Sequence, residues 1–172
     1  MNTYQRDEEE PETYPAVPAD LNNAGLAWSR IEEWISWRWS EREVNWTVEG
    51  AGWWAPDLKP VTITATEKWQ DLTWQAVTLD PSPLGGYVLD GETYRFTATV
   101  GADADDVPAA VQEAVTRLDA YMAEAAERHG AGRYEVSIGG LSESFDRNPT
   151  WRARALHLSG AADLLRKYRR AP

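Results

Sequence analysis

The sequence predicts an α+β fold in which helices flank an antiparallel β-module and a helical tail ends the chain. Two changes in the spacing of apolar residues carry this prediction. Apolar residues recur every three or four positions over residues 20–40, at alternate positions through much of residues 43–101, and every three or four positions again over residues 106–128. The first and third patterns are typical of helices, and the second is typical of strands with one buried face.

The first predicted helix covers residues 20–40, with Asp20 or Asn22 as its cap. Its apolar stripe is wide and contains four tryptophans, in the set Trp28, Ile31, Trp34, Ile35, Trp37 and Trp39. A stripe of this width indicates a helix that is buried on more than one side.

The β-module of residues 43–101 is expected to hold four or five strands. Alternation is clearest over residues 44–48, 61–65 and 94–100, with a weaker strand near 74–79. A further short strand at 87–89 precedes Asp90-Gly91, a pair that favours a hairpin turn.

The second half of the chain returns to helical spacing. A helix is predicted over residues 106–128, with Asp106 as its cap and Pro108 in the first turn, where a missing N–H costs no hydrogen bond. A short strand over residues 133–138 and a polar loop follow. Asn148-Pro149 then starts a final helix.

This order divides the chain into three parts. Residues 1–19 are rich in Glu and Pro and hold too little apolar surface to fold alone, so they are expected to form a flexible acidic arm. Residues 20–159 form the main domain. Gly160 bends the final helix and Ser159 can cap the part beyond it, so residues 160–172 form a separate C-terminal tail.

The C-terminal residues differ from the rest of the chain in charge. Residues 151–172 contain six basic residues and one acid, Asp163, whereas the whole chain has a formal net charge of −11. This contrast favours an acidic body with a basic, amphipathic docking peptide. In the alternative interpretation, the final helix packs on its own domain and exposes a solvated charged face.

Several classes of function lack support in the sequence. The chain has no cysteine, phosphate loop or nucleophile motif, and its two histidines, His129 and His157, lack metal-ligand spacing. Asp103, Asp105 and Asp106 precede a helix, where acids act as caps. We therefore expect no enzyme, metal or cofactor. An acidic body argues against general nucleic-acid binding, and the absence of a long apolar run or signal peptide argues against a membrane or an export route.

The ten tryptophans suggest broad aromatic contact surfaces, in a core or at subunit interfaces. The adjacent pair Trp53-Trp54 leaves a second interpretation open, a Trp-rich carbohydrate-binding module. Neighbouring strand residues point to opposite faces, so the pair would form one flat platform only across a bulge.

Four stretches of sequence together resemble the head–tail adaptor (connector) proteins of tailed bacteriophages and gene transfer agents. They are IEEWISWRWSEREV, SPLGGYVLDGETYRFTATVG, VPAAVQEAVTRLDAYMAE and the ending WRARALHLSGAADLLRKYRR. The resemblance covers most of residues 20–170 and is strongest in SGAADLLRKYRR. The resemblance rests on the order of these stretches along the chain and on their short similar sequences. No catalytic motif is involved.

The resemblance implies a virion structural protein of the neck, made in the host cytoplasm. Such a protein joins the portal protein as a dodecameric ring and extends the DNA channel, without sequence-specific DNA binding, towards a stopper or tail-terminator protein. Residues 20–159 would then be the adaptor domain, and residues 160–172 the portal-docking tail. In this family the C-terminal segment inserts into the portal assembly, so the portal-binding candidates are Leu164, Leu165, Arg166, Lys167, Tyr168, Arg169 and Arg170.

Overall fold

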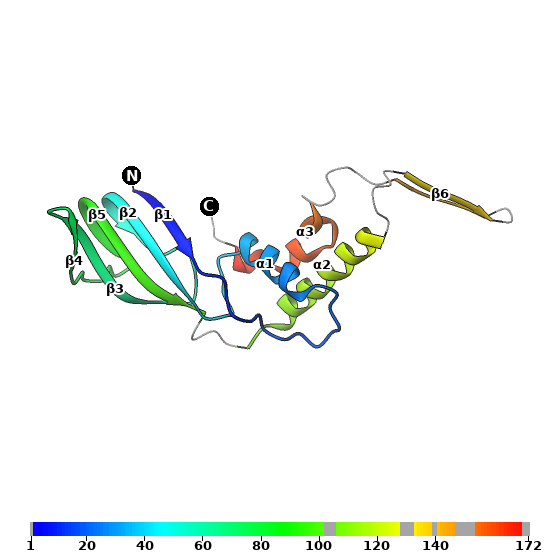
Figure 1. Cartoon of the computed structure of the whole chain (residues 1–172), viewed down its shortest axis with the longest axis horizontal. Helices are drawn as coiled ribbons and strands as arrows, with labels where there is room; N and C mark the ends of the chain where they lie inside the picture. Colours follow the sequence, from blue (N-terminus) through cyan, green and yellow to red (C-terminus); the bar gives the residue numbers. More distant parts are fainter. Residues whose placement is uncertain (1, 102–105, 128–132, 139–140, 147–153, 170–172) are drawn as a thin grey trace. The chain divides into compact units, whose positions relative to one another are not determined.

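The computed structural model describes residues 2–101, 106–127, 133–138, 141–146 and 154–169 (Figure 1). It confirms the α+β class. The chain divides into two compact units: a sheet unit, with residues up to Pro15 and Ser36–Val107, and a helical unit, with Ala16–Ile35 and Pro108–Arg169.

The sheet unit is built on a five-stranded antiparallel sheet with the order β1-β2-β5-β3-β4. The strands are β1 (Thr3–Glu8), β2 (Arg42–Trp54), β3 (Val61–Gln70), β4 (Thr73–Ala76) and β5 (Tyr87–Val100). The predicted β-module is therefore present with nearly the predicted limits. The long strand β5 lies between β2 and β3.

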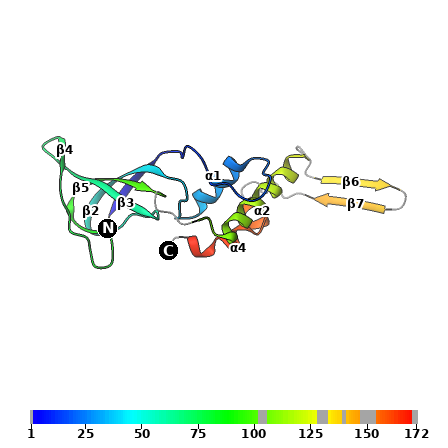
Figure 2. The same ribbon diagram turned by 90° about the horizontal axis from the view of Figure 1, so that it is seen from below.

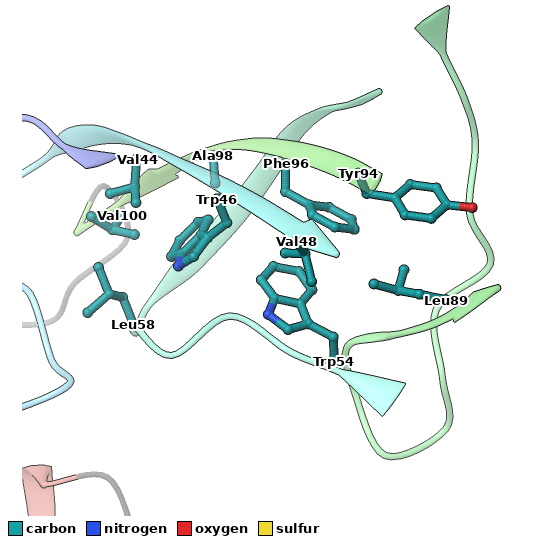
Figure 3. Packing of buried hydrophobic residues seen from close by; sticks show 10 residues of the cluster. All are labelled: Val44, Trp46, Val48, Trp54, Leu58, Leu89, Tyr94, Phe96, Ala98 and Val100. Carbon is teal, nitrogen blue, oxygen red and sulfur yellow. The ribbon is translucent and has the colours of Figure 1, made fainter. Parts of the chain in front are cut away.

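One face of this sheet carries the hydrophobic core (Figure 3). The rings of Trp54 and Phe96 stack with centroids 4.4 Å apart, and Trp46 lies edge-on to Trp54 at 6.1 Å. Leu58, in the loop after β2, closes the core and is 1% exposed. Burying each such side chain contributes roughly 1.5–3 kcal/mol. The alternating pattern thus places apolar residues on one face and leaves Thr, Asn and charged residues on the other.

The predicted hairpin turn at Asp90-Gly91 is wrong. β5 runs through these residues, and Asp90 pairs with Ala51 of β2. The register shifts between Glu49 and Ala51, where Gly50 has φ +119°, and Gly91 on the opposite strand has φ +105°. A β-bulge of this kind bends a strand pair without ending it, and glycine accepts the positive φ.

The predicted flexible arm is also wrong for residues 3–8, because β1 pairs with β2 along its whole length. Two carboxylates connect this edge strand to its unit. Asp57 accepts hydrogen bonds from the Arg6 guanidinium at 2.7 Å and from the buried Trp46 indole at 2.8 Å. Glu8 accepts from the buried Arg38 guanidinium at 2.5 Å. Composition alone missed this strand because its partners lie far away in the sequence.

The helical unit contains α1 (Ala24–Trp34), α2 (Ala109–Glu127), α3 (Ala155–Leu158), α4 (Ala161–Leu164) and the single 3-10 turn η1 (Arg166–Tyr168). The helix α2 packs against α1, α3 and α4. Its fully buried residues Val111, Val115 and Leu118 continue the predicted apolar face. In α1, Trp28 and Ile31 are fully buried.

Both long helices are shorter than predicted. The cap of α1 is Asn23, whose side chain accepts the N–H of Leu26 at 3.1 Å, rather than Asp20 or Asn22. The helix ends at Trp34, because Ile35 is extended and Trp37 forms a bridge with Lys59 in the sheet unit. The tryptophans beyond Trp34 thus follow the helical spacing by coincidence.

The start of α2 differs in the same way. The carbonyl of Pro108 accepts the N–H groups of Val111 and Gln112, at 2.8 and 3.1 Å, so the helix begins after Pro108. Asp106 therefore precedes the cap position instead of occupying it.

The predicted strand at residues 133–138 is present as β6 (Arg133–Ile138). It pairs with β7 (Leu141–Asp146), which occupies the segment expected to be a loop (Figure 2). The predicted helix start at Asn148-Pro149 lies outside the described residues. None of the helices in the described ranges is long and apolar enough to span a membrane.

Candidate docking surface

The C-terminal segment is built from two short helices separated by a glycine. Gly160 has φ +77°, a left-handed conformation that ends α3. The hydroxyl of Ser159 accepts the N–H of Ala161 at 3.4 Å, at the start of α4. The predicted bend at Gly160 is therefore present. The cap of α4 is Gly160 itself, which has no side chain to accept a hydrogen bond, so the predicted capping role of Ser159 is wrong.

Apart from the exposed Leu158, the apolar residues of this segment lie mostly inside the helical unit. Leu165 is 0% exposed and Tyr168 is 9% exposed, and α4 packs against α2. Leu164 is half-buried. Leu165 and Tyr168 were expected to bind a portal, but in this structure their surface is already covered by their own chain. The arrangement favours the alternative interpretation, in which the final helix packs on its own domain.

Three basic side chains of the same segment remain exposed, and we name Arg166, Lys167 and Arg169 the basic surface. The Arg166 guanidinium lies 2.9 Å from the Asp163 carboxylate. The Lys167 ammonium lies 4.7 Å from the centroid of the Tyr168 ring. The segment thus separates its two kinds of residue, with apolar residues inside and basic residues outside. Arg170 lies outside the described residues.

Trp34 supports the basic surface from α1. The guanidinium carbon of Arg169 lies 4.3 Å from the centroid of the Trp34 ring, within the range of a cation–π interaction. The ring of His157 meets the same ring edge-on, with centroids 5.0 Å apart. Sequence reasoning missed this role of Trp34, since its helical spacing assigned the residue to a core.

The sheet unit contributes the opposite charge. A groove of about 720 Å³ lies between the segment after β1 and the start of β2. Its lining includes five glutamates, namely Glu9, Glu10, Glu12, Glu41 and Glu43. These glutamates place negative charge in the sheet unit, whereas the basic surface belongs to the helical unit.

The two tryptophans that suggested carbohydrate binding lie on opposite faces of β2. Trp54 is 5% exposed and belongs to the core, whereas Trp53 is 53% exposed. The Trp53 indole donates a hydrogen bond to the carbonyl of Gly85 at 2.8 Å. A flat platform made of both rings is therefore absent from the sheet unit.

Two aspartates have perturbed titration. Burial alone raises the pKa of the Asp119 carboxyl. N–H groups of Asn22 and Asn23, at 2.7–2.9 Å, together lower it by more than burial raises it, so the pKa lies below its ordinary value. The Lys68 ammonium and then the Tyr94 hydroxyl lower the pKa of Asp90 to about 2. Each carboxylate joins two distant segments of one unit.

The described residues contain no group of three His, Asp or Glu side chains placed to hold a metal ion. His157 contacts Trp34, while His129, Asp103 and Asp105 lie outside the described residues. Comparison of the chain with family models, curated proteins and solved structures found no match.

Proposed function

We propose that this protein is a virion structural protein, a head–tail adaptor that docks on the portal through its basic surface and prolongs the DNA channel towards the tail. The observation that carries the proposal is the exposure of Arg166, Lys167 and Arg169 on a segment anchored by two buried neighbours. The resemblance of SGAADLLRKYRR to adaptor endings supports the same assignment. On this proposal the copies form a dodecameric ring, with a stopper or tail-terminator protein on the far side.

The contact of Arg169 with Trp34 suits docking because it holds this charge in place before binding. The Arg169 guanidinium lies over Trp34, and Arg166 lies beside Asp163. A side chain that is already ordered loses less conformational entropy when it binds. Arginine and lysine can then form charge-assisted hydrogen bonds with carboxylates of the portal. The exposed Arg166–Asp163 pair itself adds little to folding stability.

The sequence predicted that Leu165 and Tyr168 themselves bind the portal. Because both residues are buried, docking is assigned to the exposed basic residues instead. Leu165 and Tyr168 hold the segment on α2, so the helical unit presents the basic surface as part of a folded body. Leu158, next to His157 and 52% exposed, offers an apolar contact on the same segment. A single such surface binds weakly, and a ring of copies binds firmly because the remaining contacts become intramolecular.

The test is a pull-down of the full chain with the portal protein encoded in the same genome. The double variant Arg166→Glu/Lys167→Glu reverses two exposed charges, and we expect it to lose portal binding while keeping its melting temperature. The matched control is Lys59→Glu, which reverses an exposed charge in the sheet unit. Unchanged binding by the double variant would contradict the proposed docking surface.

A second measurement tests the ring. Native mass spectrometry of the protein alone is expected to show a monomer or weak oligomer, and addition of portal is expected to give a closed ring. A stable dimer that portal does not change would contradict ring assembly.

A further inference from the structure

The outer face of the sheet, opposite the core, contains a small polar groove. It has a volume of about 330 Å³ and is lined by side chains of β1, β2 and β5, namely Gln5, Asp7, Asn45, Thr47, Arg95 and Thr97. The strand register places these residues in two adjacent rows across the three strands. One row is Gln5, Thr47 and Arg95, and the other is Asp7, Asn45 and Thr97.

Half of this lining is available to a ligand. Among the described residues, the side chains of Gln5, Asp7 and Thr47 make no hydrogen bond or ion pair. All three are exposed. Together they offer an amide, a carboxylate and a hydroxyl within two rows of one sheet, where neighbouring strands lie about 4.8 Å apart.

The other half of the lining is fixed by contacts within the sheet. The Thr97 hydroxyl donates to the Asn45 side-chain oxygen at 2.7 Å. The Arg95 guanidinium lies 2.5 Å from the Glu67 carboxylate. These contacts give the groove a preformed wall beside its three free groups.

An aromatic pair lies next to Arg95, beyond the residues that line the groove. The guanidinium carbon of Arg95 lies 4.6 Å from the centroid of the Trp74 ring, and Trp69 meets Trp74 edge-on at 5.1 Å. Trp69 is 39% exposed. The β3–β4 hairpin that carries both tryptophans therefore places aromatic surface next to Arg95, at one end of the row Gln5, Thr47 and Arg95.

We propose that this groove binds a neutral saccharide of one or two rings. Sugar hydroxyls both donate and accept hydrogen bonds, which matches the mixed lining, and the C–H face of a sugar ring packs on exposed aromatic surface. The Arg95 charge is already offset by Glu67, so Asp7 is the unpaired charge among the described residues of the lining. A carboxylate accepts hydrogen bonds from sugar hydroxyls and repels an anionic ligand, which favours a neutral saccharide over an acidic one. The volume lies at the lower end of the ligand-site range of about 300–1,000 Å³, which limits the ligand to a short saccharide. This activity goes beyond the adaptor role and does not depend on it.

The experiment is an NMR titration of the full chain with maltose, cellobiose and N,N′-diacetylchitobiose, each a neutral saccharide of two rings. With at least one of them we expect saturable shifts of the side-chain amides of Gln5 and Asn45. The variant Asp7→Ala/Thr47→Ala removes two free groups and is expected to weaken binding by about tenfold. The matched control Thr62→Ala truncates an exposed threonine outside the groove and is expected to bind like the parent.

Three results would overturn the proposal. The first is the absence of saturable shifts with all three oligosaccharides, and the second is an equal loss of affinity in Thr62→Ala. The third is a shift of the same amides with protein concentration and no sugar, since that would assign this face to a contact between copies. Unchanged melting temperatures of the variants separate each result from unfolding.

Discussion

Truncation of Leu165 to alanine distinguishes two interpretations of the C-terminal segment. In one the segment packs in the helical unit, and in the other it is a detachable docking peptide. Leu165 is 0% exposed inside the helical unit, so Leu165→Ala leaves a cavity in a packed interior. Such substitutions cost about 2–5 kcal/mol of unfolding free energy. For a chain of this size, each kcal/mol lowers the melting temperature by roughly 2–4 °C. We therefore expect a melting temperature lower by roughly 4–20 °C.

The matched control for this prediction is Leu158→Ala, the same change at a residue that is 52% exposed on α3. Thermal and urea melts followed by far-UV circular dichroism measure both variants. We expect a small effect for Leu158→Ala, because surface substitutions usually stay within about 0.5 kcal/mol. If both variants melt like the parent, Leu165 does not pack in the helical unit and the segment is a free peptide.

Three further predictions follow from the described contacts. Asp57→Ala leaves the buried indole N–H of Trp46 without its acceptor, which costs about 1–3 kcal/mol of stability. We expect faster hydrogen exchange of the β1 amides in this variant, and unchanged exchange rates would refute the prediction. Gly86→Ala places a Cβ 2.3 Å from a backbone oxygen, whereas the Cβ of Gly85→Ala meets nothing within 4 Å. The urea midpoint of Gly86→Ala is therefore expected to fall below that of Gly85→Ala, and equal midpoints would contradict the clash. Asp119 has a folded pKa below its ordinary 3.8, so its contribution to stability is present above that pH and is lost as the pH falls through the folded value. Urea melts at a series of pH values are expected to show a weaker acid dependence in Asp119→Asn, and an unchanged dependence would count against this role.

The strands β2 and β3 and the second half of β5 were predictable because local pattern decides them. Alternation over residues 44–48, 61–65 and 94–100 reflects one buried and one solvated face of the sheet. Adjacent residues in each strand therefore alternate between apolar and polar, and this pattern is visible in the sequence. The pairing of β1 was not predictable in this way. Its edge position depends on Asp57 and Arg38, which lie far along the chain.

The candidate docking surface was predictable in charge but not in packing. The excess of Arg and Lys near the end identifies Arg166, Lys167 and Arg169 from the sequence alone. Apolar spacing cannot say whether Leu165 and Tyr168 face a partner or their own chain, since both uses require the same residues. The contact of Arg169 with Trp34 depends on how α1 meets the C-terminal segment, and no local signal encodes that.

The proposed portal contact is tested most directly by a cryo-EM map of the particle neck. A ring of this protein against the portal is expected, with Arg166, Lys167 and Arg169 of each copy facing portal carboxylates and Leu165 still packed in its own helical unit. A neck in which these basic residues face solvent, or in which the protein is absent, would contradict the proposal.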